Sequence, residues 1–135
     1  MAAKNLALGG WFVLLAAGWA LSLGVSVVSA DAQLASYPTL HSFNGQDGRE
    51  PRAPLMQASD GLLYGTTNVG GAYGKGTAFQ FNPLTGALKT LVAFKGTNGA
   101  SPQGGLMQAA DGRLYGATTS GGAIGNGVIY RISLF

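Results

Sequence analysis

Short runs of alternating hydrophobic and polar residues cover the chain from residue 37 onward, and such alternation predicts β-strands. Residues 37–43 form the first of these runs, and residues 88–94 repeat it. We expect three side chains of the 77–82 run, Thr77, Phe79 and Phe81, to face inward. Gln80, and Arg131 in the related run 128–133, should face water. No helical period is found in this part of the chain.

The same pattern occurs twice. Residues 55–71 recur as residues 106–122, an offset of 51 positions, and extending that offset aligns 40–84 with 91–135 with 20 of 45 pairs identical. A period near fifty residues is typical of proteins built from structural repeats. The chain is therefore one structural unit made twice.

Two kinds of connection separate the expected strands. Asp60-Gly61 lies between the apolar runs 54–58 and 62–67, and Asp111-Gly112 repeats it. An Asp-Gly pair between two such runs favours a tight hairpin. Residues 83–86 predict a further turn. Longer, glycine-rich loops cover residues 44–52, 68–76, 95–103 and 119–127.

Four short strands in about fifty residues are typical of one propeller blade. We therefore predict an all-β fold of two four-stranded antiparallel, propeller-like blades, an incomplete β-propeller, from residues 36–86 and 87–135. In an up-and-down sheet the first and third connections lie at the same end. The long loops of each blade should thus share one rim, which is the expected binding surface.

The N-terminal residues 1–32 have the layout of a secretory signal peptide. Lys4 precedes an uncharged run from 6 to 28, and Ala30-Asp31-Ala32 offers a cleavage site that would release a chain beginning at Gln33. Val28-Ser29-Ala30 is a rival cleavage site. The alternative is an uncleaved membrane-anchoring helix, because 23 residues make about 34 Å of helix. The expected location is outside the cell or at its surface, with the periplasm as a further possibility.

The repeated positions that we interpret as structural are Asp60, Gly61, Tyr64, Gly65, Gly70 and Gly71, with Asp111, Gly112, Tyr115, Gly116, Gly121 and Gly122. Their spacing resembles the GloVer repeat of the choice-of-anchor tandem repeat proteins over about 95 residues. The resemblance implies a repeat-built, propeller-like bacterial protein, exported to the cell surface or beyond, with no enzymatic role for the repeat.

The chain shows two copies of that family pattern, and we expect no anchoring segment before Phe135. Two blades cannot close a ring, and an open stack of blades leaves apolar sheet faces exposed to water. We expect self-association or further propeller blades; a truncated member and a small two-sheet sandwich are the alternatives.

Composition excludes several function classes. Beyond residue 32 there are seven basic and four acidic residues, scattered rather than clustered, which argues against a nucleic-acid partner. There is no cysteine for a disulfide or a thiolate metal site. The single histidine, His41, corresponds to Val92, so we interpret it as a half-buried strand residue. We predict no catalytic residues, metal or cofactor.

One uneven feature remains on the long-loop rim, where the first repeat carries residues that the second lacks. The candidate ligand-binding residues are Arg49, Arg52, Tyr73 and Lys75, against Ala100, Gln103, Ile124 and Asn126. Ordinary solvated loop charge is the competing interpretation, since Asp47 and Glu50 lie among them.

The predicted function is therefore an exported, non-enzymatic β-repeat protein that acts as a binding or surface-interaction module for a protein or polysaccharide. The first alternative is a sugar-binding lectin assembled from two-blade chains. The second is a carbohydrate-active enzyme, for which Asp47 and Glu50 are the neighbouring carboxylates.

Overall fold

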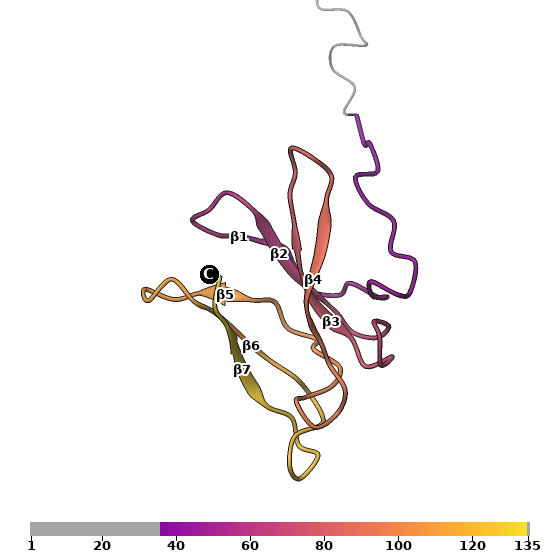
Figure 1. The fold of residues 1–135 in the computed structure, drawn as a ribbon, viewed down its shortest axis with the longest axis vertical. Helices are drawn as coiled ribbons and strands as arrows, with labels where there is room; N and C mark the ends of the chain where they lie inside the picture. The colour runs from indigo at the N-terminus through magenta and orange to yellow at the C-terminus, as the bar shows by residue number, and fades with distance from the viewer. Residues whose placement is uncertain (1–35, 135) are drawn as a thin grey trace, which may run out of the picture. The chain divides into compact units, whose positions relative to one another are not determined.

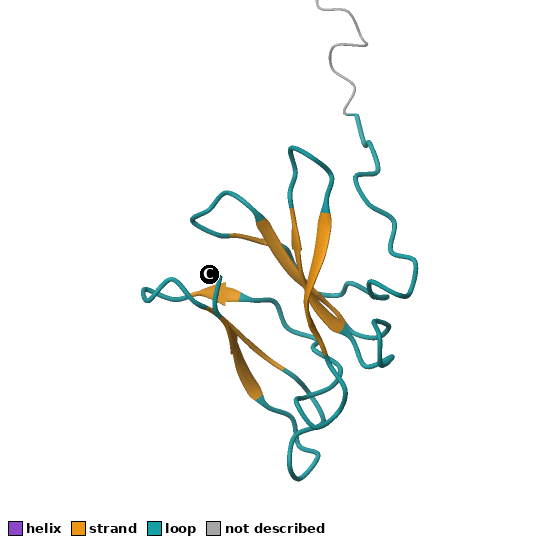
Figure 2. Cartoon of the chain, in the orientation of Figure 1, coloured by secondary structure: helices purple, strands orange, loops and turns teal. Residues whose placement is uncertain are grey.

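A computed structural model describes residues 36–134, and all of the strands lie within the unit Thr39–Phe135. Within the described range the chain forms strands, turns and loops without a helix (Figure 2). The predicted all-β class is confirmed. The expected leader, residues 1–32, lies outside the described residues. In residues 36–134 no helix is long and apolar enough to cross a membrane.

The first sheet has four antiparallel strands in chain order (Figure 1). They are β1 (Met56–Gln57), β2 (Leu63–Thr67), β3 (Thr77–Phe81) and β4 (Leu88–Ala93). The second sheet has three, also antiparallel and in chain order. They are β5 (Met107–Gln108), β6 (Leu114–Ala117) and β7 (Ile129–Ile132).

The prediction of two four-stranded sheets is wrong in its count. Residues 88–93, expected to open the second blade, instead pair with β3 and close the first sheet. Residues 37–43, expected to be the matching strand of the first blade, form no strand. The reason is one of pairing: a strand at this repeat position joins the sheet of the preceding repeat, and no repeat precedes residues 37–43 in the described chain.

A single hydrophobic core joins the two sheets. Its buried members come from both sheets and from residues next to their strands, and are Ala58, Tyr64, Ala78, Phe94, Leu106, Leu114 and Ile132. One face of the first sheet, with Tyr64 and Ala78, therefore packs against the face of the second that carries Leu114 and Ile132. Burial of this apolar area is the main force that holds the sheets together.

The predicted facing of β3 is correct for its inward residues only. Thr77, Phe79 and Phe81 are all buried. The opposite face is not wet, because Ala78 is also fully buried and Gln80 is half-buried, donating from Nε2 to the Tyr64 hydroxyl over 2.7 Å. Arg131, on the second sheet, is exposed as predicted. Thus both faces of the first sheet are covered, and a face of the second is not.

The two predicted Asp-Gly hairpins are confirmed between β1 and β2 and between β5 and β6. In the first, Asp60 accepts hydrogen bonds from the Leu62 amide (3.0 Å) and the Tyr64 hydroxyl (2.7 Å). Gly61 adopts φ 81°, the left-handed region that Gly enters readily. In the second, Asp111 accepts in the same way from Arg113 and Tyr115. Turn geometry accounts for both aspartates.

Candidate interaction surface on the long loops

The four long loops are held together by backbone hydrogen bonds, and we call residues 44–52, 68–76, 95–103 and 119–127 the long-loop surface. In the first repeat, the Arg49 amide donates to the Val69 carbonyl (2.7 Å) and the Val69 amide donates back (3.2 Å). In the second, Ala100 and Ser120 exchange the same two bonds at 2.8 and 3.2 Å. The first and third connections of each repeat therefore lie side by side.

The loops of the two repeats also join each other. The Ser101 amide donates to the Lys75 carbonyl over 2.9 Å, and the Phe94 amide donates to the Gly76 carbonyl over 3.0 Å. Gly76 has φ 94°, and a Cβ there would lie 2.3 Å from the Thr67 carbonyl oxygen and 2.7 Å from Pro102. Only glycine fits so close an approach. The long-loop surface is consequently continuous from one repeat to the next.

Arg52 is occupied by an ion pair within this surface. Its Nη2 donates to Oε2 of Glu50 over 2.7 Å, and Asn68 Nδ2 donates to the same oxygen over 3.2 Å. The hydrogen bond from Asn68, followed by that from Arg52, lowers the pKa of Glu50. Both side chains of the ion pair are about half exposed, so this bridge mainly fixes the loop.

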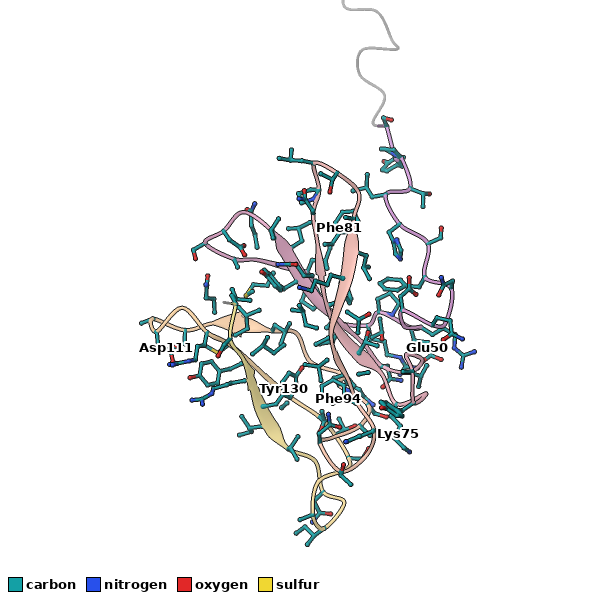
Figure 3. The ribbon with its side chains drawn as sticks, in the orientation of Figure 1. Glu50, Lys75, Phe81, Phe94, Asp111 and Tyr130 are labelled. Carbon is teal, nitrogen blue, oxygen red and sulfur yellow. The ribbon has the colours of Figure 1, made fainter. Side chains whose placement is uncertain are left out.

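The other three candidate residues project from the first repeat without such partners. Arg49, Tyr73 and Lys75 are exposed, Tyr73 to 59% of its surface. Neither Arg49 nor Lys75 forms an ion pair with a carboxylate of residues 36–134. Figure 3 shows Glu50 and Lys75 on the same side of the unit, and Asp111 in its hairpin on the other. The structure thus separates the four residues into one that is paired and three that are available.

Two left-handed residues occupy equivalent loop positions, and the sequence pattern missed them. Glu50 has φ 56° and Ser101 has φ 55°, 51 residues later. A non-glycine residue in this region costs about 1–2 kcal/mol. The two carbonyls accept from the Asn68 and Thr119 amides, which holds this bend in both repeats. Neither residue type favours positive φ, so no local signal could have indicated the conformation.

His41 was expected to be half-buried in a strand; it is half-buried but lies outside any strand. Its Nε2 lies 2.8 Å from Oδ2 of Asp47, and its ring packs edge-on against Phe43 with centroids 5.1 Å apart. The Asn44 amide donates to the other Asp47 oxygen over 3.0 Å. Within residues 36–134 the contact with Asp47 is the single side-chain hydrogen bond of the His41 imidazole.

The family model described as the Gloeobacter/Verrucomicrobia repeat matches residues 20–134. The chain belongs to this GloVer repeat family. Neither a curated protein nor a solved structure matches the chain.

The GloVer repeats of this chain differ in what their loops could bind. No three His, Cys, Asp or Glu side chains in the described residues lie close enough together to hold a metal ion. Asp47 and Glu50, the carboxylates considered for hydrolysis, are each engaged in hydrogen bonds within the loops. The first GloVer repeat exposes the cations Arg49 and Lys75 and the phenol of Tyr73. The loop backbone that carries them is fixed by hydrogen bonds.

Proposed function

We propose that this protein is an exported, non-enzymatic binding module whose long-loop surface contacts a partner outside the cell. The observation that carries the proposal is the continuous backbone network that holds Arg49, Tyr73 and Lys75 exposed on loops joined across both repeats. A loop backbone that is already fixed loses little conformational entropy when it binds. Conserving loop geometry while changing loop side chains is how repeat scaffolds vary their ligands.

The chemistry of these residues favours an acidic partner. Arg49 and Lys75 supply positive charge without a carboxylate partner among residues 36–134, and Tyr73 adds an amphipathic ring with a hydroxyl. The second repeat has Ala100, Ile124 and Asn126 at these places, and its long loops carry one cation, the exposed Lys95. An acidic polysaccharide or an acidic protein segment fits this pattern.

The test is binding to an array that contains acidic and neutral polysaccharides and polyglutamate. The double variant Arg49→Ala, Lys75→Ala should lose most binding to the acidic probes. Lys89→Ala is the matched control, because Lys89 is an exposed lysine on β4 outside the long-loop surface, and it should bind as the unmodified chain does. Absence of binding to every probe on the array, or equal losses of binding in the variant and its control, would contradict the proposal.

The lectin alternative is tested on the same array. A sugar-binding site would use the Tyr73 ring as a stacking platform, so Tyr73→Ala would abolish binding to neutral glycans while Arg49→Ala would not. The enzyme alternative requires release of shortened glycans by the chain and its loss in Asp47→Asn, Glu50→Gln. The hydrogen bonds already made by both carboxylates weigh against that alternative.

Export is tested separately from binding. Expression of the full chain in a bacterium that secretes proteins should give a product outside the cytoplasm whose first residue, by mass spectrometry, is Gln33. A product that keeps Met1 and sediments with membranes would instead support an uncleaved anchor.

A further inference from the structure

Among residues 36–134, no strand pairs with the outer edge of β7, whereas the equivalent edge of β3 pairs with β4. β3 pairs with β2 on one side and β4 on the other, whereas β7 pairs with β6 and, among the described residues, with no strand on its other side. The two strands also differ in exposure at one repeat position. Ile129 of β7 is 83% exposed, while Ala78, at the same repeat position in β3, is 0% exposed.

The chain carries a strand of the right kind in another place. Residues 37–42 precede Phe43 as residues 88–93, the strand β4, precede Phe94. Phe94 and Tyr130, both labelled in Figure 3, pack edge-on with ring centroids 5.0 Å apart. Phe43 packs against Phe79 with centroids 5.2 Å apart. These are equivalent contacts at the 51-residue offset. Phe43 therefore already holds its repeat position, and the segment before it lacks a sheet to join.

The face beside that edge is open in the same way. On the outer face of the second sheet, Met107 is 59% exposed and Ile129 is 83% exposed. The equivalent face of the first sheet, with Met56 and Ala78, packs into the shared core. In this chain the second sheet covers that face. A first sheet from another copy, with its buried Phe79 side turned toward the open face, would repeat the same stacking.

We propose that residues 37–42 of one copy pair with β7 of a second copy and complete its sheet, head to tail. The register follows from β3 and β4, where Ala78 lies opposite Val92, Gln80 opposite Lys89 and Phe81 opposite Leu88. Shifted by one repeat, Ile129 lies opposite His41, Arg131 opposite Pro38, and Ile132 opposite Tyr37. Pro38 has no amide hydrogen to give, which an outermost strand tolerates.

The partner is a second copy because of the repeat itself. A strand added to a sheet edge gains backbone hydrogen bonds from any sequence, and side-chain fit at alternate positions selects the occupant. His41 is already near Phe81, with ring centroids 6.4 Å apart, as its counterpart Val92 packs on the cluster that contains Ile132. Each copy gives one strand and receives one, so the contact is heterologous and builds a closed ring or an open filament.

The first experiment uses a matched pair of lysine substitutions in the full chain, expressed for export and measured by light scattering. The unmodified protein should have at least twice the monomer mass. Ile129→Lys places a charge on the open face and should give monomers. Leu84→Lys alters a residue that is 94% exposed in the β3–β4 turn and should leave the mass unchanged. A monomeric unmodified protein, or an Ile129→Lys variant that stays assembled, would overturn the proposal.

The second experiment tests the strand pairing directly and exploits the absence of cysteine from the chain. Equal amounts of P38C and R131C, mixed and oxidised, should form covalent heterodimers, whereas P38C mixed with T85C should not. Both Pro38 and Arg131 are exposed, so neither change disturbs the core. Cross-linking no faster than in the control mixture would contradict the proposed register. A cross-link within single chains of the double variant would also overturn it, because the chain would then fill its own edge.

Discussion

The two GloVer repeats have nearly the same loops and hairpins but different surroundings. In the first sheet, β3 has a strand on each side, and Ala78 and Phe79 on its two faces are buried. In the second, β7 has one neighbouring strand among the described residues, and Ile129 is 83% exposed. The repeated sequence determines the loops and hairpins, whereas the elements next to each sheet determine how much of it is buried. A repeat of this kind is therefore completed by what stands beside it.

The largest expected effect comes from the phenylalanine that follows each repeat's strand-forming segment. Phe94 is fully buried, so Phe94→Ala should lower the free energy of unfolding by about 3–5 kcal/mol. Phe43 is half-buried in the equivalent contact, and Phe43→Ala should lower it by roughly 1–2 kcal/mol. Urea unfolding of both variants measures the gap. Equal losses of stability would mean that Phe43 is buried as completely as Phe94.

Exchange of the residues at one repeat position sharpens the same contrast. Ala78→Ile adds volume to a site with no exposed surface and should destabilise by about 1–3 kcal/mol. Ile129→Ala removes an exposed side chain and should change stability by no more than about 0.5 kcal/mol when the protein is dilute. Thermal unfolding at low and high protein concentration measures both. If copies cover Ile129, the second variant should lose stability at high concentration only.

The sequence predicted the features that depend on local chemistry. Alternation, the repeat and the Asp-Gly turns predicted an all-β chain with hairpins at Asp60 and Asp111, all of which the structure contains. It placed the long loops at common ends, and the bonds between Arg49 and Val69 agree with that arrangement. These features follow from turn geometry and from the side-chain period of a strand.

The sequence could not predict which sheet each strand joins. Residues 37–43 and 88–94 have the same alternation, yet only residues 88–93 form a strand, since β3 is available as a partner there. The two-faced burial of β3 was missed because Gln80 is polar, although its amide is satisfied by the Tyr64 hydroxyl. Likewise, the His41–Asp47 contact joins residues with no counterpart of the same type in the second repeat.

A smaller effect is expected from Tyr130, which stands where the first repeat has Phe79. Its hydroxyl is buried without a hydrogen-bond partner in the described structure, and burial raises its pKa to about 12. Tyr130→Phe should therefore stabilise the protein by about 1 kcal/mol at neutral pH, because an unpaired buried hydroxyl is removed. The reverse exchange, Phe79→Tyr, should destabilise by a similar amount. Loss of stability in Tyr130→Phe would show that the hydroxyl has a partner.

The raised pKa of Tyr130 predicts that the free energy of unfolding falls at alkaline pH. The unfolded chain releases this proton near its ordinary pKa of 10.0, whereas the folded chain holds it to about 12. Stability is thus full below about pH 10 and falls as the pH rises to about 12, at about 1.4 kcal/mol per pH unit at most. In urea titrations, Tyr130→Phe should reduce this loss of stability at alkaline pH. The buried Tyr64, whose pKa burial also raises, should leave a residual slope in the variant.

The smallest effect is expected at the second hairpin, where Asp111 accepts bonds that lower its pKa to about 2. The Arg113 amide is the largest cause, followed by the Tyr115 hydroxyl and the Arg113 guanidinium. The unfolded carboxylate takes up its proton near the ordinary value of 3.8, so the stabilisation is present above that pH and is lost as the pH falls toward about 2. Asp111→Asn should lower the urea midpoint slightly at pH 6 and leave it unchanged at pH 2. Because Asp111 is exposed, salt should shrink the difference at pH 6, whereas a salt-independent loss at both pH values would trace the effect to turn conformation.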